Sequence, residues 1–395
     1  MKNYIFGTGA FAAEVAKRLD KFGIDIECFI NIRDKNKEIP NTVYNNIPAY
    51  YVENVEEIDK NNSNIIIAKK PMFMGSAIDY LRKNKYKNVY AVNEEMFFSE
   101  QITKEELLKY FDRIDLEKPF LNYLEINIVD QCNLNCKGCA HFSNICDNNF
   151  VSLDKYKHDL EMIAEKFYLY NFRLLGGEPL LHPQLSELLD TTRKILPNSR
   201  IIIVTNGLLI NKLSENALKK LSESGVIVSI SLYEPTFQML DSIINTLNQY
   251  NINYLINDDY FKKTEVIEKF HTRLSTTRSE EGYLANERCS GRFCRFLRDG
   301  KISKCYYPLL IELLNKKSGM NFEVSKEDYI ELKDIVNGWD AIEKMNGDIP
   351  FCEYCREYLD EFNWESHHKN DNDYSSYVLK KRMWYNIFYK VEGMI

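Results

Sequence analysis

The sequence predicts an α/β protein with two series of parallel strands and crossover helices, followed by a small α+β extension. Residues 1–98 alternate short apolar runs with amphipathic stretches, and a second alternating series starts near residue 122. Such alternation is typical of parallel sheets whose strands are joined by helices. After about residue 260 the alternation weakens, and we expect a separate extension over residues 286–360.

Bulk composition narrows the class of protein. A chain of 395 residues, 45% hydrophobic and 28% charged, suits two or three globular domains. The net charge of −7 comes without a basic stripe, so we expect no nucleic-acid partner. No apolar run reaches about eighteen residues, and Glu14 interrupts the first one, so neither a membrane span nor a signal peptide is expected. The 10 cysteines then favour metal or redox chemistry in the cytoplasm over disulfides.

The first segment opens with a glycine-rich turn. "NYIFGTG" predicts a strand and "AFAAEVAKRLDKFG" a helix, with Gly7-x-Gly9-x-x-Ala12 between them. This arrangement aims backbone amides at a phosphate. Asn31 stands where an acid would hold a ribose, so binding of NAD is weakly supported. Further strands are expected in "IECFIN", "NIIIAKK" and "NVYAVN", with a helix in "SAIDYLRKNKY".

The segment resembles the Rossmann-like domains attached to sugar-modifying enzymes of polysaccharide pathways. The resemblance rests on "FGTGAF" and "ECFIN", and it implies that Gly7 and Gly9 bind a nucleotide or a nucleotide-sugar. A domain that only docks or dimerises is the alternative, because a single such motif is a weak signal. A charged stretch over residues 99–119 follows and predicts a linker helix.

The second series, over residues 120–285, is expected to form five strands and four helices in alternation. The strands are placed near 123–129, 171–175, 200–205, 226–232 and 252–257, and the helices over 153–168, 184–196, 213–224 and 236–249.

Three cysteines crowd the loop after the first of these strands. Cys132, Cys136 and Cys139 are spaced C-x3-C-x2-C, and three thiolates in so short a loop can wrap one face of a compact cluster. Zinc would need a fourth ligand, for which Cys146 and His141 are candidates. A 4Fe-4S cube normally takes four cysteines, so a cube held by three leaves one iron open.

The ends of the next three strands also carry unusual residues. Gly176 and Gly177 would let the backbone pass close to a ligand, and Glu178 can accept a hydrogen bond from an ammonium group. Barrels of alternating strands and helices build active sites at the carboxyl ends of their strands, and a zinc knuckle would not explain these loops. The other two loops contribute Thr205, Asn206, Gly207, Ser229 and Ser231.

Together these motifs resemble the radical S-adenosylmethionine (SAM) superfamily. The resemblance implies a partial (β/α)6 TIM-type barrel, a 4Fe-4S cluster on the three cysteines and SAM on its open iron. Reductive cleavage of SAM would give a 5'-deoxyadenosyl radical, with a flavodoxin- or ferredoxin-type reductant as partner. The implied SAM contacts are Gly176, Gly177, Glu178, Thr205, Asn206, Ser229 and Ser231.

The chain departs from the family pattern at two positions. Members often carry an aromatic residue before the third cysteine, near the adenine, where this chain has Gly138; Phe142 or His141 is then expected to take its place. Tyr233 stands where some members have an acid, so no acid role is carried over.

A second cysteine group lies in the extension. Asp299 and Gly300 separate two short runs and predict a hairpin. The group resembles the SPASM and twitch extensions, and since no cysteine follows the last one, the shorter twitch form with one auxiliary 4Fe-4S cluster is implied. Its expected ligands are Cys289, Cys305, Cys352 and Cys355, with Cys294 as the spare or in place of Cys289. A zinc-ribbon site is the alternative, because the same geometry suits tetrahedral zinc.

Two further features are assigned structural roles. The tail over residues 361–395 has basic and aromatic residues at helical spacing and predicts a helix packed against the barrel. Cys146 is expected to be a packing residue, with donation of a hydrogen atom to a substrate radical as the alternative.

We therefore expect a radical SAM enzyme, oxidoreductase-like or epimerase-like, that abstracts hydrogen from a substrate carbon. A sugar or nucleotide-linked sugar is the first choice of substrate, because the first segment does not resemble the winged-helix domains of peptide-modifying relatives. A ribosomally made peptide, to be crosslinked or epimerised, is the alternative. An alternative function of a different class is that of a non-catalytic scaffold protein that binds an iron-sulfur cluster or zinc.

Overall fold

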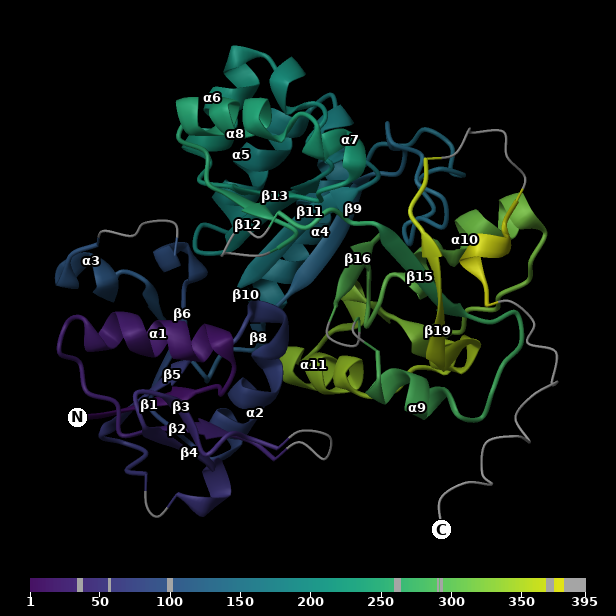
Figure 1. Cartoon of the computed structure of the whole chain (residues 1–395). Helices are drawn as coiled ribbons and strands as arrows, with labels where there is room; N and C mark the ends of the chain where they lie inside the picture. The colour runs from purple at the N-terminus through teal and green to yellow at the C-terminus, as the bar shows by residue number, and fades with distance from the viewer. Residues whose placement is uncertain are drawn as a thin grey trace, which may run out of the picture.

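The computed structural model describes residues 1–33, 38–55, 58–97, 102–258, 264–289, 291, 294–366 and 373–379. Two large sheets with helices packed against them, and a smaller layer on the far side of the second sheet, make up this part of the chain (Figure 1). Most strands in both large sheets pair in parallel, so the expected mixed α/β class is confirmed in its coarse form.

The N-terminal sheet has seven strands in the order β3-β4-β2-β1-β5-β6-β7. Ile5 and Phe6 in its central strand are fully buried, since the sheet is covered on both faces. Its elements are β1 (Lys2–Phe6), α1 (Ala10–Asp20), β2 (Cys28–Asn31), β3 (Thr42–Tyr44), β4 (Ile47–Tyr51), β5 (Ser63–Ile67), α2 (Gly75–Lys83), β6 (Asn88–Val92), α3 (Lys104–Leu108) and β7 (Phe111–Arg113).

The linker helix predicted over residues 99–119 is wrong for most of its length. Helix α3 is only five residues long, and it begins at a capping box formed by Thr103 and Glu106; residues 99–101 lie outside the described residues. Strand β7 then pairs antiparallel with β6. The open edge of the N-terminal sheet supplies hydrogen-bond partners that the local charge pattern could not reveal, so the sheet extends to Arg113.

The second sheet has the order β14-β13-β12-β11-β9-β16-β17-β18. The five predicted strands form and pair in parallel. Within the described residues, four strand–helix units and a fifth strand, β14, follow one another where the resemblance implies six units, and β16 joins the sheet beside β9 from the extension. The elements are β9 (Leu124–Val129), α4 (Leu153–Lys166), β11 (Asn171–Gly176), α5 (Leu185–Ile195), β12 (Arg200–Thr205), α6 (Glu215–Glu223), β13 (Ile227–Ile230), α7 (Glu234–Phe237), α8 (Leu240–Gln249) and β14 (Tyr254–Ile256).

Side chains alternate between the two faces of this sheet. Leu124 and Ile126 of β9 pack into the core formed with the helices, whereas Glu125 and Asn127 point to the opposite face. On that inner face Ile202, Ile227 and Leu255 form a small apolar cluster. The inner face is therefore polar at β9 and apolar on the side formed by β12, β13 and β14.

The extension contains the expected hairpin. Strands β16 (Phe296–Arg298) and β17 (Lys301–Ser303) pair antiparallel, and Asp299 and Gly300 both adopt positive φ, as a tight primed turn requires. The remaining elements are β8 (Phe120–Leu121), β10 (Tyr168–Leu169), β15 (Lys269–Leu274), α9 (Gly282–Glu287), α10 (Tyr307–Ser318), β18 (Ile330–Glu331), α11 (Gly338–Asn346) and β19 (Cys355–Asn363). The C-terminal helix expected in the tail falls mainly on residues beyond 379, outside the described residues.

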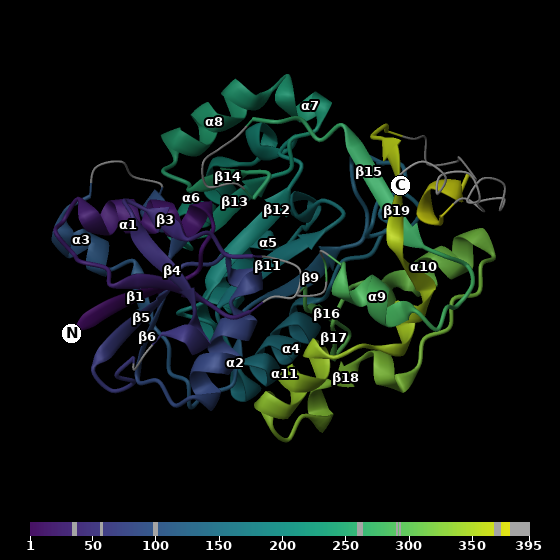
Figure 2. The same cartoon turned by 60° about the horizontal axis from the view of Figure 1, so that its bottom comes forward.

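Buried contacts join the N-terminal sheet to the rest of the molecule. Arg200 of β12 donates to the carboxylate of Glu94 at 2.7 Å, and both side chains are almost fully buried. Helices α2 and α11 lie side by side, where the Arg82 guanidinium sits 4.2 Å from the centre of the Trp339 ring (Figure 2). The N-terminal segment is therefore docked firmly onto the second sheet and the extension.

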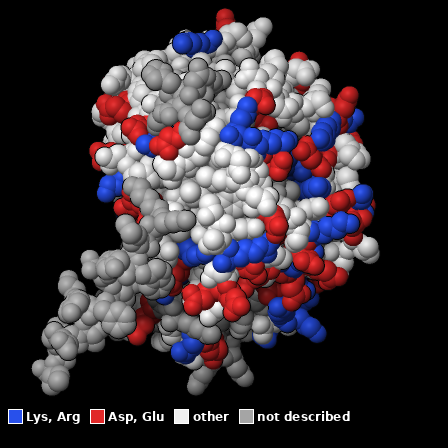
Figure 3. Space-filling model, turned by 90° about the vertical axis from the view of Figure 1, so that its right-hand side faces the viewer, with Lys and Arg blue, Asp and Glu red and all other residues white. Residues whose placement is uncertain are grey.

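On the face shown in Figure 3, lysine and arginine side chains are interspersed with acidic ones around an uncharged area. Among the helices in the described part of the chain, none combines the length and apolarity that a bilayer crossing needs.

Candidate metal and cofactor site

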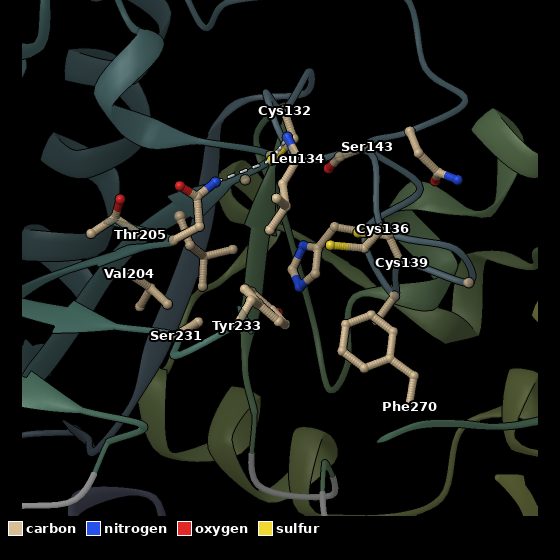
Figure 4. A pocket seen from close by; sticks show the side chains of 18 of the residues that line it. Cys132, Leu134, Cys136, Cys139, Ser143, Val204, Thr205, Ser231, Tyr233 and Phe270 are labelled. Carbon is tan, nitrogen blue, oxygen red and sulfur yellow. Dashed lines mark hydrogen bonds between the residues drawn. The ribbon is translucent and has the colours of Figure 1, made fainter. Parts of the chain in front are cut away.

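The C-x3-C-x2-C loop leaves β9 at its carboxyl end and forms one wall of a cavity of about 430 Å³. Figure 4 shows Cys136 and Cys139 side by side, with Cys132 nearby on the same loop. The opposite wall comes from the ends of the neighbouring strands β11, β12 and β13. The structure thus brings together four loops singled out in the sequence, and their lining residues are Gly176, Gly177, Val204, Thr205, Asn206, Ser231 and Tyr233.

Gly176 and Gly177 are needed for packing against the cysteine loop. A Cβ atom on Gly176 would lie 2.0 Å from the carbonyl oxygen of Val129, and one on Gly177 would lie 2.0 Å from that of Gln131. The amide of Gly177 also donates to Val129 at 2.8 Å. The sequence led us to expect a close approach to a ligand; both glycines line the cavity, and their nearest neighbours are the backbone of Val129 at the end of β9 and of Gln131 in the cysteine loop.

Glu178 ties two of the loops together from inside the protein. Its side chain is fully buried and accepts three hydrogen bonds. The donors are the Thr205 hydroxyl at 2.6 Å, the Asn206 backbone N–H at 2.9 Å and the Leu180 backbone N–H at 3.0 Å. Burial raises the pKa of this carboxyl to about 7. Its oxygens are occupied by protein donors and it does not line the cavity, so the expected ammonium contact does not match the geometry.

Hydrogen-bond donors point at the cysteine sulfurs. The side-chain amide nitrogen of Asn206 lies 3.6 Å from Cys132 Sγ, a contact drawn as a dashed line in Figure 4. The backbone amide of Leu134 lies 3.5 Å from the same sulfur. The Trp364 indole donates to Cys136 Sγ at 3.1 Å. Such donors suit sulfurs that carry negative charge as ligands of an iron-sulfur cluster. Burial raises the pKa of the Cys132 thiol to about 12, so a bound metal would have to displace its proton.

Ser143 is a cavity residue that the sequence analysis missed. Its side chain is 2% exposed and lines the cavity, yet its hydroxyl has no hydrogen-bond partner within the described chain. A buried hydroxyl without a partner is costly, so this atom fits a polar group of a bound molecule. Its position four residues after Cys139 was the only available signal.

Two expected contacts, Phe142 and Ser229, lie elsewhere, and so does Cys146, which was expected to be a packing residue. Phe142 adopts a φ of 58° and is buried against Tyr307 and Tyr377, so it does not line the cavity. Ser229 is buried and donates to Asp258 at 2.5 Å. Cys146 donates to the Ser143 carbonyl at 3.5 Å and is not among the lining residues of this cavity.

The space beside Gly138, the residue before the third cysteine, is already occupied, so a side chain would not fit there. A Cβ atom on Gly138 would lie 2.4 Å from the tip of the Phe362 ring, and the φ of Gly138 is +63°. Phe362 belongs to β19, so an aromatic ring does approach this part of the loop, but it comes from the extension.

A second cavity, of about 370 Å³, is lined by all five cysteines of the extension. Burial raises the pKa of the Cys305 and Cys294 thiols; Cys352, Cys355 and Cys289 add to this effect at Cys305, and Glu125 and Cys289 add to it at Cys294. The Arg273 and Lys304 side chains also line this cavity, and Arg273 Nη1 is buried without a partner in the described chain. Cations beside several sulfurs suit an anionic cluster. Within the described residues, no three His, Cys, Asp or Glu side chains converge on a single metal-ion position.

The two cavities share a wall. His141, His271 and Tyr306 line both of them. The His141 ring stacks on Tyr306 with centroids 5.0 Å apart and bonds through Nδ1 to the Asn127 oxygen at 2.9 Å. Burial lowers the pKa of His141 to about 4, so the ring is neutral at pH 7.

The glycine-rich turn at the N-terminus is separate from these cavities. Gly7 has a φ of +146°, and a Cβ atom there would lie 2.5 Å from the Ala68 carbonyl oxygen, so packing within the sheet requires a glycine. Nothing lies within 4 Å of a Cβ on Gly9. Asn31 donates to the Thr8 hydroxyl at 3.1 Å and accepts from Lys69 at 2.9 Å.

Comparisons with solved structures find only partial likeness. BtrN in complex with AdoMet and 2-DOIA aligns over 59% of this chain and 85% of its own, with a TM-score of 0.38 and 18% identity. Native anSMEcpe with AdoMet and the Cp18Cys peptide aligns over 34% of this chain and 42% of its own, with a TM-score of 0.28 and 20% identity.

Sequence comparisons find relatives for the part of the chain that forms the second sheet. GTP 3',8-cyclase of Clostridium perfringens is 27% identical over 164 residues, 38% of this chain and 50% of the relative. That of Clostridium acetobutylicum is 34% identical over 128 residues, 31% of this chain and 39% of the relative. The chain thus spans about half or less of the length of these curated relatives. Residues 126–255 match the family model of the radical SAM superfamily. The cysteine loop and the strand ends facing it lie within that match, so this segment of the chain is similar to the radical SAM superfamily.

Proposed function

We propose that this chain holds a 4Fe-4S cluster on Cys132, Cys136 and Cys139, with SAM on its open iron, and removes a hydrogen atom from a substrate carbon. The observation that carries the proposal is the first cavity, where three sulfurs face polar residues from three neighbouring strand ends. When bound, the cluster and SAM supply a 5'-deoxyadenosyl radical. A flavodoxin- or ferredoxin-type protein is the proposed reductant.

The protein's own residues would hold and shield the bound groups. Glu178 fixes the Thr205 and Asn206 loop, so that both residues line the cavity. The Ser143 hydroxyl is available to a polar atom of SAM or substrate. Tyr233 and Phe270 meet edge to face at the cavity wall and would keep water from a radical.

Formation of 5'-deoxyadenosine and methionine from SAM tests the proposal. The reconstituted full chain, given dithionite and SAM without air, should release both products, and Cys136→Ala should release neither. A wild-type chain that carries a cluster and leaves SAM intact would instead support a non-catalytic scaffold.

We propose that the second cavity holds one auxiliary 4Fe-4S cluster on Cys289, Cys305, Cys352 and Cys355. The support is that these four sulfurs line one cavity; Cys294 lines it too and is the alternative to Cys289. Such a cluster could take an electron from the product radical, giving a dehydrogenation, or orient the substrate. A structural zinc site is the competing occupant.

For the substrate we propose a sugar or a nucleotide-linked sugar. A third cavity, of about 490 Å³, lies between α2 and the extension and shares Asn286 and Lys304 with the second cavity. Cavities therefore continue from the N-terminal segment toward the cysteine loop. Amide and charged side chains suit a ligand rich in hydroxyl groups. The amides in this lining are those of Asn84, Asn122, Asn286 and Asn346.

Calorimetry of the full chain tests the substrate class and the nucleotide role of the turn at Gly7 and Gly9. UDP-sugars, CDP-sugars and NAD would be titrated separately. Heat from a nucleotide-sugar that is lost in Asn84→Leu supports binding between α2 and the extension. Absence of heat from all three would refute the nucleotide proposal and leave a peptide as the substrate to examine.

A further inference from the structure

Strand β19 runs from the second cysteine site to the first. It begins at Cys355, which lines the second cavity, and the residues just beyond its end lie against the C-x3-C-x2-C loop. There the Lys137 amide donates to the Glu365 carbonyl at 2.9 Å, and the Ser366 hydroxyl donates to the Leu134 carbonyl at 2.5 Å. A short antiparallel bridge joins Cys136 to Ser366. The extension therefore fixes the backbone of the cysteine loop directly.

Trp364 lies in the middle of this contact. Its indole nitrogen is 3.1 Å from Cys136 Sγ, closer than either nitrogen that donates to Cys132. Its ring stacks on Tyr233, with centroids 5.3 Å apart and an angle of 22° between the planes. Its backbone amide donates to the Glu268 carbonyl at 2.7 Å. Both the ring and the backbone are held, so the indole N–H is aimed at the sulfur before any cluster binds.

An N–H donor at a ligand sulfur affects the redox chemistry of an iron-sulfur cluster. Reduction adds negative charge, part of which resides on the sulfurs, and a hydrogen bond to charged sulfur strengthens as that charge grows. Hydrogen bonds to the sulfurs are one of the factors by which a protein sets the reduction potential of such a cluster. The donor therefore stabilises the reduced form more than the oxidised form.

Resting on the proposed function, we propose that Trp364 is a positioning residue for the radical SAM cluster: its indole holds the Cys136 sulfur and makes the cluster easier to reduce. The residue belongs to the extension and lies 228 positions from its partner in the sequence. The extension thereby contributes to the first site as well as to the second.

A redox titration of the reconstituted full chain, followed by EPR, tests this role. The signal that changes when SAM is added identifies the first cluster. Trp364→Phe should shift the midpoint potential of that signal to a more negative value at equal iron content, and Trp364→His, which restores a ring N–H donor, should move it back toward wild type. The matched control is Trp339→Phe, which removes an indole that packs over Arg82 and should leave the potential unchanged.

A second measurement does not depend on the folding of a variant. In wild-type protein with ¹⁵N in the indole of its 3 tryptophans, pulsed EPR of the reduced first cluster should show coupling to a nitrogen. Trp364→Phe should remove this coupling and Trp339→Phe should keep it. No coupling in a loaded wild-type cluster, or an unchanged potential in loaded Trp364→Phe, would overturn the role of Trp364. A wild-type chain that binds no cluster at Cys132, Cys136 and Cys139 would instead overturn the proposed function.

Discussion

At the scale of single residues, the loops around the first cavity are held by Glu178, which does not line the cavity, and by the close backbone packing of Gly177, which does. The Glu178 carboxylate is enclosed by three protein donors. Gly177 permits a backbone contact that a methyl group would block. Both residues stand in the motif that the sequence marked as a SAM contact, and both act in this structure through the loops they position.

Glu178 should make stability depend on pH. Its pKa is raised from 4.5 to about 7 by burial, so between these values the folded chain keeps a proton that the unfolded chain releases. The free energy of unfolding of the metal-free protein should therefore fall as pH rises from about 4.5 to about 7. Urea unfolding at several pH values measures this slope. Glu178→Gln cannot titrate and should lack this component, whereas an equal slope in wild type and variant would contradict the assignment.

Gly177→Ala should push the loop after β11 away from the cysteine loop. The added methyl group would lie 2.0 Å from the Gln131 carbonyl oxygen, and a backbone atom cannot move aside as a side chain can. Overpacking of this kind costs about 1–3 kcal/mol. We expect a lower free energy of unfolding and poor iron loading, measured by urea unfolding and iron analysis. In the matched control Gly347→Ala, the nearest atom is 3.5 Å away and both quantities should be close to those of wild type.

At the scale of elements, strand alternation and turn chemistry were reliable guides. Strands β9, β11, β12, β13 and β14 and the hairpin at Asp299 and Gly300 formed where apolar runs and turn residues predicted them. The stretch over 99–119 failed as a helix because β7 found an edge strand to pair with. The pairing of β15 with β19 was not predicted, since it joins segments about 90 residues apart and has no local signal.

The auxiliary cluster should still bind when Cys294 is replaced, because its four proposed ligands remain in place. Wild-type protein is expected to carry about eight irons per chain, four in each cluster. Cys355→Ala should retain about four, and Cys294→Ala about eight, because Cys294 is the spare cysteine of the five that line this cavity in the proposed ligand set. Iron and zinc analysis with Mössbauer spectroscopy measures this. Zinc bound in Cys132, Cys136 and Cys139 triple alanine variants would favour the zinc-ribbon alternative.

At the scale of the whole molecule, the N-terminal sheet is part of one structure with the radical SAM segment. The Arg200–Glu94 pair is buried between them, and α2 packs on α11 of the extension. Cavities lined by residues from all three parts lie along these junctions.

Breaking the Arg200–Glu94 pair should weaken the packing of the N-terminal sheet on the second sheet. Removing one partner of a buried ion pair costs about 3–5 kcal/mol. In Glu94→Ala, Arg200 would keep a longer contact with Glu95 Oε1 at 3.9 Å. We expect Glu94→Ala to lower the free energy of unfolding by this amount in urea. The double variant Glu94→Leu with Arg200→Met leaves no isolated charge and should be closer to wild type, so a double variant as unstable as the single one would contradict this explanation.

The sequence by itself determined the alternating strands, the hairpin and the spacing of the cysteine motifs, because local periodicity and short spacings fix these features. Only the tertiary structure decided which atoms meet across long separations. Trp364 donates to Cys136, Phe362 occupies the space beside Gly138, and the five cysteines of the extension surround one cavity. These contacts depend on the path of β19 back to the cysteine loop, and no local pattern encodes where a strand will end in space.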